Sequence, residues 1–106
     1  MAEYTFIPNL VSALPEVPGD AILSKSLQKD GDVDVTLFFF AAGQELTAHT
    51  SPIPAIIHVL DGQLELTLGK DVLSAGPGRW AHMPANLPHA LKALTPVKML
   101  LTMIKD

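Results

Sequence analysis

Short apolar segments alternate with turn-forming residues along the whole chain. Nine prolines and seven glycines interrupt the sequence, and the segments between them are rich in Val, Ile, Leu, Phe and Thr. Turn signals at intervals of about 8–12 residues are typical of a β-sandwich or a β-barrel. Strands are expected over residues 21–28, 33–40, 45–50, 55–60, 63–68, 71–74, 79–83, 89–94 and 97–104. Residues 9–14 are expected to form one helical turn before Pro15.

Alternation within the segments predicts which side chains face the core. Directly neighbouring residues of a strand point to opposite faces, so a core face shows apolar residues at every second position. In the last segment this face consists of Val97, Met99, Leu101 and Met103. In the segment 63–68 it consists of Leu64, Leu66 and Leu68. The methionines are interpreted as core residues rather than soft copper ligands, because methionine is a common filler of apolar interiors.

Two dipeptides, Asp30-Gly31 and Asp61-Gly62, predict tight hairpin turns. If Asp61-Gly62 is a two-residue turn, His58 lies directly opposite Glu65 on the next strand. Ala55 then points inward and His58 points outward, either toward a carboxylate or into a subunit interface. A longer turn would shift the register and reverse these directions.

Composition and charge exclude several classes of protein. The 106 residues, 48% of them apolar, suffice for one domain and leave no room for a second. The net charge of −4, without a run of Lys or Arg, disfavours nucleic-acid binding. The absence of cysteine excludes disulfides, thiolate catalysis and Cys-ligated zinc. No apolar run approaches the roughly 20 residues of a membrane span, and the N-terminus lacks signal-peptide features. A soluble cytoplasmic protein without membrane contact is expected.

Two segments, 43–62 and 78–89, carry a resemblance to a known family. The first begins Gly-Gln-Glu-Leu-Thr-Ala-His and ends Val-Leu-Asp-Gly; the second begins Gly-Arg-Trp-Ala-His and ends Asn-Leu-Pro-His. Their spacing resembles the two motifs of the cupin family, and together with their spacer they cover roughly half of the chain. The resemblance implies an all-β double-stranded β-helix, a jelly-roll-like antiparallel barrel. A single cupin domain over 1–106 is expected, with an N-terminal arm over 1–20 and the barrel over 21–106.

The resemblance also implies a site. Cupins usually bind one divalent metal through two histidines and a glutamate of the first motif and a histidine of the second. His49 matches the first of these ligands and His89 the last, whereas Ser51 stands at the second histidine position and Ala55 at the glutamate position. Half of the usual set is therefore missing. The site is expected to hold one divalent transition metal (Ni, Zn, Mn, Fe or Cu) or to line a pocket without a metal.

The remaining candidates follow from alternation around the motifs. Ser51, Ala55, Trp80 and Met83 are expected to line the pocket. His82 shares a face with Trp80, and the pattern leaves open whether this face joins the pocket as a third imidazole; His58 is a weaker candidate ligand. Alternation also places His49 on a polar strand face, opposite Leu46 and Ala48; the other polar members of that face are Glu45, Thr47 and Ser51. Such an inner face is expected only where it lines a solvated pocket.

Three functions remain open at this stage, and no catalytic residue is assigned. The first is a barrel that binds a divalent metal, a small polar ligand, or both. The second is a metal-dependent dioxygenase, isomerase or lyase acting on a small anionic metabolite. The third is a metal-free module that binds or senses a metabolite. A homodimer is also expected, because small cupins commonly exchange N-terminal strands and this N-terminus is apolar. Its apolar residues are Tyr4, Phe6, Ile7, Leu10 and Val11.

Overall fold

The structure, a computed structural model, describes residues 4–16 and 19–105; of the predicted arm, residues 1–3 and 17–18 lie outside this part, as does residue 106 of the barrel. A short 3-10 turn, η1 (Val11–Ala13), precedes nine strands. The strands are β1 (Ile22–Asp30), β2 (Val33–Phe40), β3 (Glu45–His49), β4 (Ala55–Asp61), β5 (Leu64–Leu68), β6 (Asp71–Ala75), β7 (Trp80–Met83), β8 (His89–Ala93) and β9 (Val97–Ile104). All nine predicted strands are present, each with ends within two residues of the prediction.

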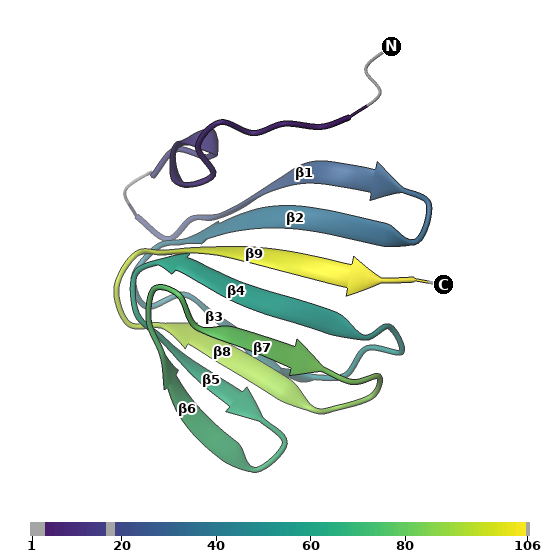
Figure 1. Ribbon diagram of the computed structural model, residues 1–106. Coiled ribbons are helices and arrows are strands. Elements are labelled where there is room, and N and C mark those ends of the chain that lie inside the picture. Colours follow the sequence, from purple (N-terminus) through teal and green to yellow (C-terminus); the bar gives the residue numbers. More distant parts are fainter. Residues whose placement is uncertain (1–3, 17–18, 106) are drawn as a thin grey trace.

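The strands form two antiparallel sheets that enclose the interior (Figure 1). The five-stranded sheet has the order β1-β2-β9-β4-β7, and the four-stranded sheet has the order β3-β8-β5-β6. Between β2 and β9, only the step from β5 to β6 stays within one sheet; every other connection crosses to the opposite sheet. The expected all-β jelly-roll barrel is therefore confirmed.

The inner core lies between the two sheets and follows the predicted alternation. It unites residues from both sheets, with the largest buried side chains at Phe40, Val59, Leu64 and Val97. The predicted inward row of β9 is confirmed, because Val97 and Met99 are buried and Leu101 and Met103 pack against the same cluster. In β5, Leu64 and Leu66 are buried and Leu68 packs beside them.

A second apolar cluster covers the outer face of the five-stranded sheet. Leu14 of the N-terminal segment packs there against Leu37 and Phe39 of β2. Phe38 and Phe40 point to the opposite face, where their rings stack with centroids 5.7 Å apart. Lys98 is buried, and its ammonium group donates a hydrogen bond to the carbonyl oxygen of Val11. The N-terminal segment thus makes β2 a strand with apolar contacts on both faces.

One of the two predicted hairpins is wrong. Asp30 lies opposite Val33, so β1 and β2 form a tight hairpin as predicted. The Asp61-Gly62 dipeptide instead carries the chain across from the five-stranded sheet to the four-stranded sheet. His58 consequently lies opposite Trp80 on β7 and Leu100 on β9, not opposite Glu65. Its outward direction agrees with the prediction, because Ile57 and Val59 on either side of it are buried in the inner core.

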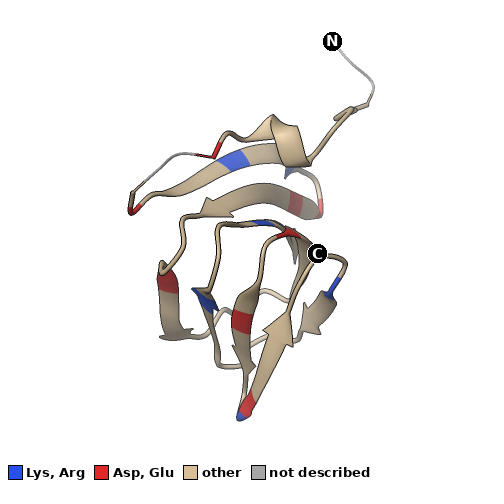
Figure 2. Ribbon diagram, turned by 90° about the vertical axis from the view of Figure 1, so that its left-hand side faces the viewer, with Lys and Arg blue, Asp and Glu red and all other residues tan. Residues whose placement is uncertain are grey.

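Charged side chains are spread over the strands and turns. Figure 2 shows acidic and basic positions interspersed along the ribbon rather than gathered on one face. Within residues 4–16 and 19–105, no helix has the length and apolar character needed to cross a membrane.

The crossing at Gly62 yields a stability prediction. Gly62 has a φ of +87°, and a Cβ atom there would lie 2.0 Å from the carbonyl oxygen of Pro96. Gly62→Ala must therefore displace backbone as well as strain φ, and we expect it to lower the free energy of unfolding by several kcal/mol, about 3 or more. Gly43 has the same φ of +87° but open space around it, so Gly43→Ala should cost only about 1 kcal/mol. Urea denaturation of both variants measures the difference, and equal losses would contradict the close approach at Gly62.

Candidate binding pocket

The pairing of β3 with β8 brings His49 and His89 face to face. Leu46 lies opposite Leu91, and three residues later His49 lies opposite His89, which is only two residues from Leu91. β3 therefore contains one extra residue between the two pairs, which is a β-bulge. Because of this bulge, Leu46 and His49 point to the same side of the sheet despite their odd spacing, and both line the interior.

The two imidazole rings have matching surroundings. Their centroids are 4.1 Å apart, and the ring planes meet edge to face at 61°. The Nδ1 atom of His49 lies 2.8 Å from the carbonyl oxygen of Thr47, and Nδ1 of His89 lies 2.9 Å from the carbonyl oxygen of Leu87. Because a carbonyl oxygen can only accept, each Nδ1 must carry the proton in these bonds. In the neutral form, each Nε2 then offers a lone pair.

The rings lie at a cavity of about 270 Å³ inside the barrel. His49 is exposed and His89 is half-buried, so the cavity opens to solvent beside them. Its other walls are mostly apolar and come from both sheets and two adjoining loops. They are formed by Phe38, Leu46, Ser51, Ile53, Ala55, Met83, Pro84, Leu101 and Met103. A volume of this size admits a small ligand rather than water alone.

The expectation of a polar inner face around His49 is wrong. Glu45 is exposed and lies opposite Lys92, a residue between the buried Leu91 and Ala93 of β8. Glu45 and Thr47 instead line a shallow hollow on the outer surface of the four-stranded sheet. The bulge accounts for the error, because it breaks the alternation on which the expectation depended.

Five of the residues expected at the site lie around this one cavity: His49, Ser51, Ala55, Met83 and His89. Trp80 does not; its side chain is exposed and borders a separate apolar hollow between β6 and β7. His82 is exposed and lies between Ala81 and Met83, both of which face the interior, so it points away from the two imidazoles. His58 also points outward. The residue pattern alone leaves the direction of β7 open, and the burial of Met83 determines it.

A hydrogen bond links the loop at Ser51 to the loop at Asn86 and positions this part of the cavity wall. The Ser51 hydroxyl accepts a hydrogen bond from the amide of Ile53, and the Ser51 carbonyl accepts one from the amide of Asn86 at 2.7 Å. Asn86 has a φ of +68°, a conformation that asparagine tolerates better than most residues. Asn86 ends the Pro-Ala-Asn segment of the second motif, and the cupin motif that this segment resembles has glycine at that position; asparagine can adopt the conformation needed there. The Ser51 hydroxyl is therefore engaged in a hydrogen bond with the protein backbone.

Phe38, Leu46 and Ile53 were missed as pocket residues, and Leu101 and Met103 were expected only as core residues. The signal for Leu46 is hidden by the bulge. For Met103 and Leu101 the predicted direction is right, but alternation alone does not distinguish a packed core from a cavity wall. The register supplies the missing information, because Met103 and Met83 are both cross-strand partners of Ala55.

The donors at the cavity only partly match the cupin metal set. The two Nε2 atoms suit a late first-row transition metal, and hydrogen bonding of Nδ1 to a carbonyl is usual for metal-bound histidine. No group of three or more His, Cys, Asp or Glu residues that could hold a metal ion occurs within residues 4–16 and 19–105. The residues present therefore do not form the usual three- or four-ligand set for a divalent ion, and no reaction step through such an ion follows from them.

Comparisons with known proteins agree on the fold. A family model described as a cupin domain matches residues 36–104. A conserved protein of unknown function from Streptococcus pyogenes is 31% identical, with a TM-score of 0.85 over 99% of this chain and 91% of that one. A cupin conserved barrel domain protein from Leptotrichia buccalis is 32% identical, with a TM-score of 0.78 over 86% of this chain and 44% of that one.

A cupin superfamily protein from Desulfitobacterium hafniense is 24% identical, with a TM-score of 0.85 over 94% of this chain and 92% of that one. This likeness bears on the fold alone. Comparison with curated protein sequences finds no match.

The open space beside Ala55 can be tested by filling it. Ala55 is 6% exposed and borders the cavity, so the added methyl groups of Ala55→Leu should enter empty space and raise the free energy of unfolding by about 0.5–2 kcal/mol. Ala93 is fully buried in the inner core, and Ala93→Leu should instead overpack it and cost about 1–3 kcal/mol. Chemical denaturation compares the two. A loss for Ala55→Leu as large as that for Ala93→Leu would show that the space is not there.

Proposed function

The chain belongs to the cupin family, and we propose that it is a binding barrel whose two pocket imidazoles hold a late first-row transition-metal ion through Nε2. The observation that carries the proposal is the matched pair of hydrogen bonds from Nδ1 of His49 and His89 to backbone carbonyls. These bonds fix each ring and direct its basic nitrogen away from the protein backbone. The edge-to-face contact brings the two rings close enough for both to contact one bound ion.

We propose binding alone and assign no catalytic step to this cavity. No aspartate or glutamate lines the cavity among the described residues, so no carboxylate stands ready to move a proton there. The two histidines themselves are engaged at Nδ1 by carbonyls. A metal-dependent dioxygenase, isomerase or lyase would need an acid–base partner supplied by its substrate.

A small organic ligand is the second candidate guest, and the cavity favours it. The volume of about 270 Å³ is far larger than a metal ion needs, and its walls are mostly apolar. A molecule with an apolar body and one protic group would bury its body among these side chains and donate a hydrogen bond to an imidazole Nε2. Such a ligand would be less polar than the small polar ligand or anionic metabolite expected from the sequence.

We also propose that the protein forms a homodimer through its N-terminal segment. Tyr4 and Phe6 are 78% and 75% exposed, which is unusual for aromatic side chains in a lone chain. Beside them, β1 is the edge strand of the five-stranded sheet, next to β2, and an edge strand can accept a strand from a second copy. A two-fold arrangement would cover both features in each subunit.

The metal proposal predicts a contrast between inward and outward histidines. Protein purified without an affinity metal or chelator should contain a transition metal near one equivalent, measured by elemental analysis and native mass spectrometry. His49→Ala and His89→Ala should each lower the content to about a tenth or less, because each removes one of two protein nitrogens. His82→Ala, on the outer surface, should leave it unchanged.

Either of two results would overturn this proposal: wild-type protein that takes up no added metal, or metal lost equally from His82→Ala. A bound organic mass that disappears only in His49→Ala and His89→Ala would support the small-ligand candidate instead.

The dimer proposal predicts a change of mass in solution. Phe6→Asp places a charge in the proposed interface and should convert the dimer to a monomer, measured by light scattering coupled to size exclusion. Leu94→Asp, at another exposed apolar position that is 53% exposed, should remain dimeric. A monomeric wild-type protein would contradict the proposal.

A further inference from the structure

Two methionines lie around Ala55 in the cavity wall. Ala55 on β4 has Met83 of β7 as its partner on one side and Met103 of β9 as its partner on the other. Directly opposed residues of neighbouring strands share a face, so both methionine side chains enter the barrel beside the small Ala55 side chain. Both line the same cavity as His49 and His89.

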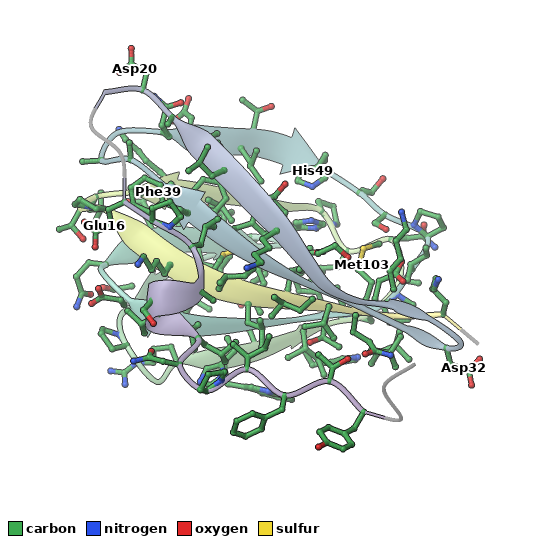
Figure 3. The ribbon with its side chains drawn as sticks, turned by 90° about the horizontal axis from the view of Figure 1, so that it is seen from above. Glu16, Asp20, Asp32, Phe39, His49 and Met103 are labelled. Atoms are coloured by element: carbon green, nitrogen blue, oxygen red, sulfur yellow. The ribbon has the colours of Figure 1, made fainter. Side chains whose placement is uncertain are left out.

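The four side chains come from opposite walls. His49 and His89 belong to β3 and β8 of the four-stranded sheet, whereas Met83 and Met103 belong to the five-stranded sheet. Figure 3 shows Met103 in the same half of the barrel as His49, with Phe39 at the other end. Two imidazole side chains from one sheet and two thioether side chains from the other therefore border one shared space.

We infer that His49, His89, Met83 and Met103 form a binding site for monovalent copper. Thioether sulfur is a soft ligand that selects copper in the monovalent state, and imidazole accepts copper as well. Ala55 contributes no oxygen donor between the two sulfurs, so the harder divalent ions lose the ligand they prefer. The inference rests on the proposed function, because it takes the two-imidazole centre and names its other donors and its ion.

The environment favours the same ion. The remaining walls are apolar, and a strongly hydrated divalent ion would have to leave its water behind without carboxylate compensation. A methionine side chain has three rotatable bonds, so its sulfur can move toward an ion in the open space. Met83 and Met103 border the cavity that His49 and His89 also line, so their side chains have open space beside them.

Competition for monovalent copper tests the inference. Cu(I) is titrated anaerobically into the whole protein in the presence of a chromophoric Cu(I) chelator, and Zn(II) affinity is measured in parallel. The Met83→Leu/Met103→Leu variant conserves volume and removes both sulfurs, so we expect about 100-fold weaker Cu(I) binding, with Zn(II) affinity changed by less than about threefold.

Met99→Leu tests which methionine of β9 supplies the second sulfur. Met99 is a buried methionine of β9 that lies four residues from Met103, about 13 Å along the strand, and it borders a deeper, smaller hollow that His49, His89 and Met83 also line. We expect its replacement to leave Cu(I) affinity within about threefold of wild type. X-ray absorption of the Cu(I)-loaded wild type should show copper–sulfur scattering, and the double variant should lack it. If the double variant does not fold, Met103→Leu at the half-buried position serves in its place.

The outcomes separate this inference from the proposed function. Cu(I) affinity that is unchanged in the methionine variants, or wild-type protein that prefers Zn(II), would overturn the copper site while leaving the two-histidine centre intact. Wild-type protein that binds neither ion would overturn both. Loss of Cu(I) binding in His49→Ala together with loss in the double methionine variant, but not in Met99→Leu, would support the four-donor site.

Discussion

The barrel depends on a point where the chain passes from one sheet to the other with no room for a side chain. At Gly62 the backbone lies against the carbonyl of Pro96, and neighbouring hydrogen bonds hold the crossing in place: the amide of Gln63 donates to the Thr95 hydroxyl, and the amide of Leu94 donates to the Gln63 carbonyl. The loop before β9 and the crossing after β4 therefore support each other. Two of the crossings between the sheets, β4 to β5 and β8 to β9, are thereby joined to each other.

Within this frame, one extra residue in β3 determines the character of the pocket. Without the bulge, the strand would present Glu45 and Thr47 to the interior with His49, and the cavity would be polar. With it, Leu46 takes the inner position, and Glu45 and Thr47 lie outside, where Glu45 is the cross-strand neighbour of Lys92. The two imidazoles become the main polar groups of an otherwise apolar cavity, so their free nitrogens dominate its chemistry.

Local sequence signals predicted the strands well because glycine and proline bound almost every one of them. They did not predict which sheet a strand joins: Asp61-Gly62 has the composition of a hairpin turn, yet it serves as a crossing, and only the long-range contact with Pro96 distinguishes the two. The same limit applies to the site. His49 and His89 could be assigned from the motifs, whereas the direction of Trp80 and His82 depends on the pairing of β7 with β4. Met103 was correctly placed inside, but its position beside Ala55 is a property of register, which no local pattern encodes.

The hydrogen bond from Lys98 to the carbonyl of Val11 joins segments that are 87 residues apart in the chain. The strand that carries Lys98 also lies between β2 and β4 in the five-stranded sheet. During synthesis, therefore, the N-terminal segment emerges before β9 and gains this hydrogen bond only when β9 has emerged. Until then, β2 and β4 lack the strand between them, and the phenylalanines of β2 have incomplete cover on both faces. The five-stranded sheet therefore cannot be completed before residues 97–104 have emerged, and protection by a chaperone would matter most in that interval.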